Sequence, residues 1–285
     1  MRRRSVWILV ALATSACAGV DITTSTTSAA ISTSSPTPTS TLPPVVDCPG
    51  AGDFGEGSGI ARVEEEGSDA TRLGRLSWER SEQCESFVFE FETSEGAPAT
   101  SVPDISVDHL PSLQVIRISM GVTSSVITDQ LVETDTVDRL YVVTSLDGAM
   151  FVDLHLKTPA AARARVQSSP GVLTIDLRPG FLDFNGVSTG NELVVLVDPP
   201  TGSEVGNVTT FSGYTRAVDS AVMVIVTQGD TVITETTTTA ADSSDGWGEF
   251  EVELILPQGN TEVFLGESDP ENGGLSGVIL DLTVS

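Results

Sequence analysis

The stretch 138-DRLYVVTSLDGAMFVDLHL-156 decides the fold of this 285-residue chain. It holds two runs rich in Val, Leu and aromatic residues, at 139–144 and 150–156. Such runs predict β-strands, and Asp147-Gly148 between them is typical of a hairpin turn. The stretch therefore predicts a β-hairpin. Because side chains alternate along a strand, His155 is expected to face solvent, opposite Leu154 and Leu156.

Similar runs lie on both sides of this hairpin. They predict strands at residues 72–78, 87–91, 113–120, 162–166 and 172–177. Three prolines interrupt the stretch 98–111, and a polar stretch leads from the third of these strands to the hairpin. A short helix over residues 158–165 is an alternative, because Pro159 and three alanines suit a first helical turn.

A second group of short strands follows a joint at residues 181–190. Its seven predicted strands are 193–197, 208–214, 221–228, 231–237, 249–256, 261–267 and 277–284. Gly, Asp, Asn and Pro separate them, which is the pattern of a β-sandwich. The sequence therefore predicts an all-β protein with two tandem β-sandwich-like domains, at residues 47–180 and 191–285.

The first 46 residues predict export. Three arginines (2–4), an apolar run (6–13) and three small residues (14–16) have the order of a signal peptide. Cys17 follows, and this arrangement resembles the lipobox of bacterial lipoproteins, which implies acylation of Cys17. Residues 17–46 predict a disordered tether, since 14 of the 21 residues 22–42 are Ser or Thr. The alternative is a secreted protein with a spare cysteine.

Two further cysteines remain if Cys17 carries lipid. Cys48 and Cys84 would then be a single pair in an oxidising compartment, which predicts a disulfide. Neither cysteine has a histidine nearby, and their spacing fits no metal site. No metal and no cofactor are therefore predicted.

The chain is strongly acidic. Without Arg2–Arg4 it has eleven basic and 40 acidic residues, a formal charge of −29. This charge argues against nucleic acid as a partner, because binding to phosphates needs positive charge, and it disfavours general attraction to anionic lipid or wall polymers. A plain role in solubility is the alternative.

Positive charge is concentrated in the first predicted domain. Residues 190–285 have sixteen acids and one base, Arg216, whereas residues 47–189 have ten bases. Contacts with carboxylates or phosphates of the cell wall are therefore expected from the first domain. The candidate binding residues are Arg139, Lys157, Arg163, Arg165 and Arg178. Alternatively, these side chains are solvated and protect sheet edges.

Two regions resemble known families. One resemblance is carried by the segments VFEF (within residues 87–91), DRLYVVTSLDGAMFVDLHL and PGVLTIDLRP. They resemble AMIN-like domains, which are β-rich modules of cell-envelope proteins. The other resemblance is carried by the segments VLVDPPTGSEV, TFSGYT, DGWGEFEVEL and GVILDLTV. They resemble the immunoglobulin-like domain of bacterial spore germination proteins. Both resemblances imply binding or assembly modules without chemistry.

Sequence motifs for catalysis are lacking. His109 and His155 are the two histidines, neither lies in a recognisable motif, and no G-x-S-x-G elbow occurs. The expected function is therefore that of a non-enzymatic, lipid-anchored protein on the extracytoplasmic face of the cell membrane. It would bind peptidoglycan or an envelope partner. The alternative is an assembly or regulatory protein of a germination-type or sporulation-type envelope complex that binds protein rather than glycan.

Overall fold

The computed structural model describes residues 48, 50, 52–81, 84–182, 188–217, 219–242, 246–268 and 274–285. These residues belong to one compact unit, Val45–Ser285. The predicted signal peptide, Cys17 and the tether lie outside the described residues. Among the residues described, no helix combines the length and the apolar character that crossing a membrane requires.

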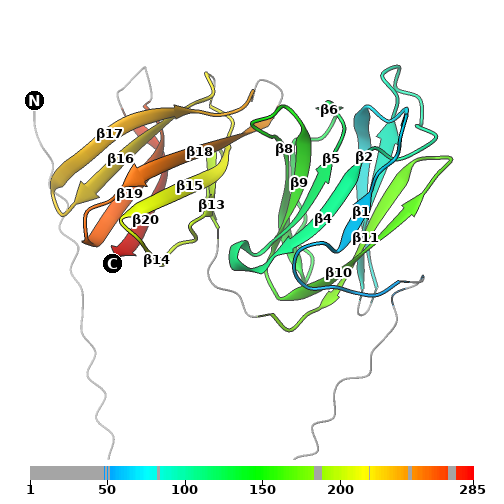
Figure 1. The fold of residues 1–285 in the computed structure, drawn as a ribbon, viewed down its shortest axis with the longest axis horizontal. Helices are drawn as coiled ribbons and strands as arrows, with labels where there is room; N and C mark the ends of the chain where they lie inside the picture. Colours follow the sequence, from blue (N-terminus) through cyan, green and yellow to red (C-terminus); the bar gives the residue numbers. More distant parts are fainter. Residues whose placement is uncertain are drawn as a thin grey trace, which may run out of the picture. The chain divides into compact units, whose positions relative to one another are not determined.

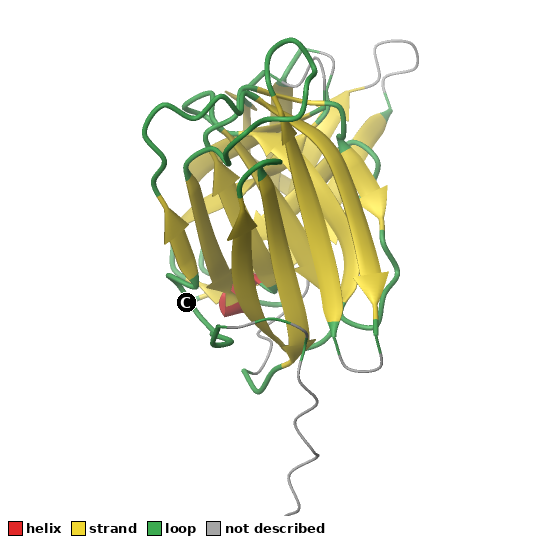
Figure 2. Ribbon diagram, turned by 90° about the vertical axis from the view of Figure 1, so that its right-hand side faces the viewer, coloured by secondary structure: helices red, strands yellow, loops and turns green. Residues whose placement is uncertain are grey.

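Strands make up nearly all of the described secondary structure. Figure 2 shows them in yellow, with a short red helix that is the 3-10 turn η1 (Pro111–Leu113). The strands form three sheets, one of ten strands and two of five. The prediction of an all-β, sandwich-like fold is confirmed.

The first five-stranded sheet has the order β10-β11-β3-β2-β6. Its strands are β10 (Ala160–Gln167), β11 (Val172–Pro179), β3 (Glu85–Glu92), β2 (Arg72–Arg80) and β6 (Ser124–Ser125). In β3 the phenylalanines 87, 89 and 91 are buried and alternate with partly exposed residues, as period-two patterning requires. The helical alternative for residues 158–165 is wrong, because β10 pairs with β11 along its whole length.

The predicted hairpin at residues 138–156 lies in the ten-stranded sheet. This part of the sheet contains β1 (Ala61–Val63), β4 (Ile105–Leu110), β5 (Val115–Met120), β9 (Met150–Leu156) and β8 (Val137–Thr144), with β7 (Asp129–Leu131) paired to β8. The turn between β8 and β9 places Gly148 at φ +84°, a conformation that glycine adopts without strain. The hairpin prediction is confirmed. A hydrophobic core lies between this sheet and the first one.

Strand β4 was not predicted. It lies between Pro103 and Pro111, and these prolines obscured a short alternating run in which Ile105, Val107 and His109 are buried. The prolines lie outside the strand, where they remove no hydrogen bond from the ladder with β1 and β5. Strand β4 thus completes the wall of the first core.

All seven strands predicted for the second region are present. The ten-stranded sheet continues with β18 (Trp247–Ile255), β15 (Val208–Thr215), β13 (Val194–Asp198) and β12 (Thr189–Gly190). The remaining sheet contains β14 (Glu204–Val205), β20 (Leu275–Val284), β19 (Gly259–Ser268), β16 (Ala221–Gln228) and β17 (Thr231–Thr239). Figure 1 shows β16, β17 and β19 as one layer beside β15 and β18. A second hydrophobic core fills the space between these layers.

One sheet passes from the first core to the second. Strand β18 pairs in parallel with β8, placing Trp247 opposite Val143. A third buried cluster forms around this pair and includes Tyr141, Phe151 and Tyr214. The two predicted domains therefore share a sheet and an apolar contact, and the exact boundaries given above stay predictions.

Cys48 and Cys84 form a disulfide, as the sequence predicts. The bond joins residues 36 apart and connects the start of the described chain to β3. It holds the glycine-rich segment 50–59 close to β10, where Gly55 pairs with Ala162. This N-terminal segment consequently covers part of the first five-stranded sheet.

Candidate binding groove

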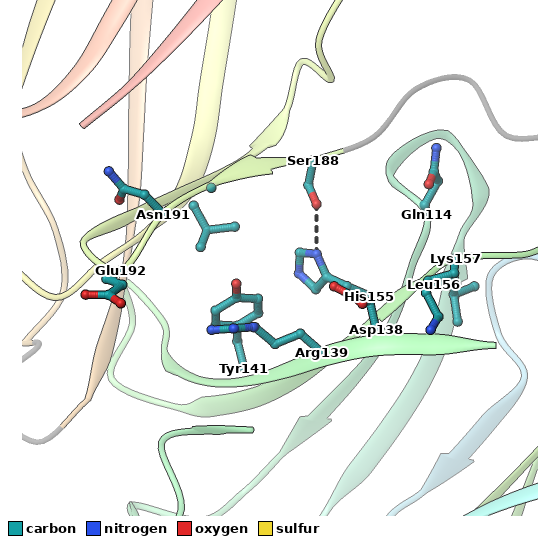
Figure 3. A pocket seen from close by; sticks show the side chains of 12 residues that line it. Gln114, Asp138, Arg139, Tyr141, His155, Leu156, Lys157, Ser188, Asn191 and Glu192 are labelled. Atoms are coloured by element: carbon teal, nitrogen blue, oxygen red, sulfur yellow. Dashed lines mark hydrogen bonds between the residues drawn. The ribbon is translucent and has the colours of Figure 1, made fainter. Parts of the chain in front are cut away.

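A groove of about 850 Å³ lies beside the end of the β8–β9 hairpin that is opposite its turn. Strands β8 and β9 provide one wall, and the residues that lead into β13 provide the other. Its lining comprises Gln114, Asp138, Arg139, Tyr141, His155, Leu156, Lys157, Ser188, Gly190, Asn191, Glu192 and Val195. In Figure 3, Asn191 and Glu192 lie at one end and Gln114 and Lys157 at the other. The groove thus brings together residues that are far apart in the sequence.

Two of the predicted binding residues line this groove. The side chain of Lys157 is exposed, and no ion pair involves it among the described residues. Arg139 lies 3.5 Å from Asp129 and stacks over the ring of Tyr141 at 5.9 Å. Both cations therefore line the groove, and Lys157 has fewer contacts with other side chains than Arg139. Asp138 and Glu192 add carboxylates, so the lining carries both signs of charge.

His155 contradicts the expectation that it faces solvent. Its side chain is only 8% exposed, and its Nδ1 and Nε2 atoms lie 2.8 Å from Ser188 Oγ and 3.1 Å from Tyr214 Oη. Strand β9 is buried on both faces, because β15 and β18 cover the side that points away from the first core. The alternation was interpreted for a sheet with one solvated face, and here side chains from β13, β15 and β18 cover that face.

A buried polar network extends from His155 through Tyr214. The hydroxyl of Tyr214 donates to Asp153 Oδ2, and Arg117 donates two hydrogen bonds to the same carboxylate, at 2.9 and 2.7 Å. Since the Tyr214 proton is used by Asp153, its oxygen accepts from His155 Nε2–H. Nδ1 of the ring is then the acceptor for the Ser188 hydroxyl. Every ring nitrogen thus has a partner.

Burial determines the protonation of this network. It lowers the pKa of His155 to about 4, although the Asp153 carboxylate opposes this effect. Burial also raises the pKa of Tyr214 well above its usual value. Burial would lower the pKa of Arg117, but the adjacent Asp153 raises it above its ordinary value. At neutral pH the network therefore contains a neutral imidazole, a neutral phenol and one ion pair.

The contact between Ser188 and His155 resembles the start of a nucleophilic pair. An imidazole with a pKa of about 4 is a weak base at neutral pH. In addition, Asp153 is bound by Arg117 and Tyr214, and the ring nitrogens bind Ser188 and Tyr214 instead of a carboxylate. The geometry therefore favours a role in holding the joint residue Ser188 against β9.

The other predicted binding residues lie away from the groove. Arg163 and Arg165 share one face of β10, as the two-residue period predicts, and both bind the fully buried Asp176. Burial opposes the charge of Asp176, but hydrogen bonds from Arg165, Ser86 and Arg163 outweigh it and lower its pKa. The alternative that these arginines are solvated is therefore wrong for Arg163, which is 4% exposed.

The N-terminal segment explains why Arg163 is covered. Its guanidinium donates to the carbonyl of Gly50 at 2.8 Å and stacks over Phe54 at 4.6 Å. Arg178 contacts the same ring at 4.4 Å. The disulfide of Cys48 keeps this segment in place, and nothing in the β10 sequence signals that a distant segment lies on it. The five predicted residues thus divide into two separate places.

Several groove residues were not singled out from the sequence. Ser188 belongs to the predicted joint, and Gln114 follows a predicted irregular stretch, so neither carries a motif. Tyr214, which contacts the groove residue His155 from the buried side, lies within the segment TFSGYT, which carried a resemblance but no site. Within the described ranges, no cluster of three His, Cys, Asp or Glu residues suited to a metal occurs.

Comparison with known proteins supports the second resemblance. Residues 193–274 match the family model of the immunoglobulin-like domain of bacterial spore germination. The match begins just before β13 and ends just before β20, so it covers most of the second core. The region is therefore similar to a domain of spore germination proteins.

The other comparisons add little. The search of curated proteins gives no match. Among solved structures, a polysaccharide lyase chain is similar at 9% sequence identity with a TM-score of 0.20. The alignment covers 74% of this chain, which spans about a third of the lyase chain's length (33%). No conclusion on fold or function is based on that likeness.

Proposed function

We propose that this chain is a non-catalytic, lipid-anchored protein of the extracytoplasmic membrane face. Cys17 would carry the lipid, and residues 17–46 would hold the β-sheet unit away from the membrane. The first core would act as an AMIN-like module that binds cell wall peptidoglycan. The lining of the groove by Lys157 and Arg139 is the observation that carries this proposal.

The chemistry of the groove suits peptidoglycan peptides. Such peptides present carboxylates and amines close together, and the groove offers two cations beside Asp138 and Glu192. A mixed lining discriminates against purely anionic polymers, because its own carboxylates repel them. The net charge of −26 acts in the same direction, because it also repels anionic polymers.

A sedimentation experiment tests the groove. The mature chain in detergent is mixed with purified peptidoglycan and pelleted, and the bound fraction is measured at several wall concentrations. Lys157→Glu should weaken retention about tenfold, which corresponds to roughly 1.4 kcal/mol. The matched control is Arg62→Glu, because Arg62 is exposed and lies outside the groove. Unchanged retention of Lys157→Glu, or an equal loss in the control, would reject the groove as the wall contact.

The lipid anchor has its own test. Mass spectrometry of the mature protein from membranes should find an acylated Cys17 at the N-terminus. Cys17→Ala should release the protein into the culture fluid, because the acyl chains on Cys17 are the proposed anchor. Recovery of an unacylated wild-type chain from the culture fluid would show that the protein is simply secreted.

A second candidate function is favoured by the match at residues 193–274. The chain would then be an assembly or regulatory protein of a germination-type envelope complex, and its partner would be a protein. Cross-linking in intact cells, followed by identification of the linked proteins, separates the two. Linked membrane proteins together with no sedimentation on peptidoglycan would favour this second function.

A further inference from the structure

The sheet formed by β14, β20, β19, β16 and β17 has a face that points away from the second core. Alternate residues of its strands point inward, such as Val224 on β16 and Leu280 on β20, and they are buried in that core. The residues between them therefore point outward. We call this surface the outer face and define it by Met223, Ile225, Phe264, Ile279, Glu235, Glu262 and Asp281.

An apolar row crosses the centre of the outer face. The register places Ile225 beside Phe264 on the next strand, and Phe264 beside Ile279 on the strand after that. Ile279 is 57% exposed, although isoleucine is usually buried. Three adjacent strands thus present apolar side chains in one line.

Two glycines shape the floor of this row. A Cβ atom on Gly266 would lie 2.6 Å from the Phe264 ring, and one on Gly277 would lie 2.8 Å from it. The ring therefore lies over both glycines, which face each other across β19 and β20. Phe264 is buried without belonging to the core cluster. The glycines thus let the aromatic ring lie low against the sheet and keep this surface flat.

Carboxylates lie beside the apolar row. Glu235 pairs with Ile225 across β17 and β16, and Glu262 pairs with Asp281 across β19 and β20. Within residues 190–285 the single base is Arg216, and it binds Asp129 on β7, away from this surface. In the part of the chain that the structure describes, no cation forms an ion pair with these three carboxylates. The outer face is therefore apolar in the centre and negative around it.

We propose that the outer face docks a protein partner that presents lysine or arginine beside apolar side chains. Burial of the exposed Ile279 and the half-buried Met223 and Ile225 would supply the stabilisation, and the carboxylates would select a cationic partner and speed its approach. A second copy of this chain is disfavoured, because two outer faces would bring like charges together. An anionic partner such as nucleic acid is disfavoured for the same reason. None of the residues that define the outer face lines the groove, and the proposal does not depend on the proposed wall contact.

Synthetic peptides of known chemistry test this proposal on the mature chain. Three labelled probes are compared by fluorescence anisotropy: a peptide of alternating lysine and valine, one of alternating glutamate and valine, and one of alternating lysine and serine. We expect the lysine–valine peptide to bind most tightly and to weaken as salt is raised. Ile279→Ser and the double variant Glu262→Lys/Asp281→Lys should each weaken its binding about tenfold or more.

Matched controls come from β18 of the same domain. Ile255 is 74% exposed and Glu251 and Glu253 are also exposed, but all three lie on the other sheet. Ile255→Ser and Glu251→Lys/Glu253→Lys should therefore leave binding unchanged, as should Lys157→Glu in the groove. Circular dichroism confirms that each variant is folded. Three results would overturn the proposal: no binding of the lysine–valine peptide, equal binding of the glutamate–valine peptide, or equal losses in the controls. Self-association of the wild-type chain that Ile279→Ser abolishes would also overturn it.

Discussion

His155 shows how one residue connects two parts of the chain. It comes from β9, and its ring nitrogens contact Ser188 of the joint and Tyr214 of β15. Removing a partner from a buried polar group costs roughly 1–3 kcal/mol, because the remaining group is left without a hydrogen bond. The ring therefore stabilises the contact of β9 with the joint and with β15.

The low pKa of His155 predicts a specific loss of stability in acid. The unfolded chain binds a proton on this ring below about pH 6.5, whereas the folded chain does so below about 4. The free energy of unfolding should therefore fall as the pH drops from about 6.5 to about 4, by roughly 3 kcal/mol from this group. Urea unfolding at a series of pH values measures this change.

Substitution separates His155 from the carboxylates that also titrate in acid. In His155→Gln the change between about pH 6.5 and 4 should be smaller than in the wild type by that amount. His109→Gln should also reduce the change, because burial lowers the pKa of His109 as well, so the two variants report the two buried rings separately. A pH profile of His155→Gln that parallels the wild type would show that the ring is not kept neutral by burial.

At the scale of elements, β10 and β11 show how a charged pair is accommodated in a sheet. Asp176 of β11 is fully buried, and two arginines of β10 bind it from one face. The N-terminal segment then covers Arg163 through the carbonyl of Gly50. A buried carboxylate with fewer partners would be costly, because its charge would remain unbalanced. The arginines of β10 therefore serve the fold of this sheet.

The disulfide acts on the same element. In the chain-entropy model, closing a loop of 36 residues stabilises the folded state by roughly 3–4 kcal/mol. The same bond holds in place the N-terminal segment that covers Arg163. The bond, the segment and the arginine–aspartate contacts thus form a connected support for β10 at the edge of its sheet.

At the scale of the whole molecule, the shared cluster couples the two cores. Trp247 is 1% exposed, and its ring contacts Tyr141 of β8 at 5.1 Å and Arg216 at 4.5 Å. Its strand also carries the parallel pairing between β18 and β8. We therefore expect the unit Val45–Ser285 to unfold in a single cooperative transition.

Removing the central ring should weaken this coupling. Trp247→Ala should lower the free energy of unfolding by about 3–5 kcal/mol and separate unfolding into two transitions. Urea unfolding followed by far-ultraviolet circular dichroism and by limited proteolysis measures both effects. Trp78→Ala is a suitable control, because Trp78 is half-buried and packs on the first core alone. A single transition at an unchanged midpoint in Trp247→Ala would show that the shared cluster does not couple the cores.

The sequence by itself determined the fold class and most strands of both cores. The β8–β9 hairpin, the three phenylalanines of β3 and the pairing of Cys48 with Cys84 follow from local rules: side-chain period, turn chemistry and cysteine arithmetic. These rules depend on neighbours in the chain. They can therefore be applied without knowing what packs against a strand.

Only the tertiary structure decided which strand faces are covered. A period of two separates the faces of β9 and β10 but does not say what lies on each one. The packing of β15 and β18 turned the expected solvated His155 into a buried ring, and the N-terminal segment turned Arg163 into a buried cation. The groove follows from the same cause, since its walls belong to residues that only long-range packing brings together.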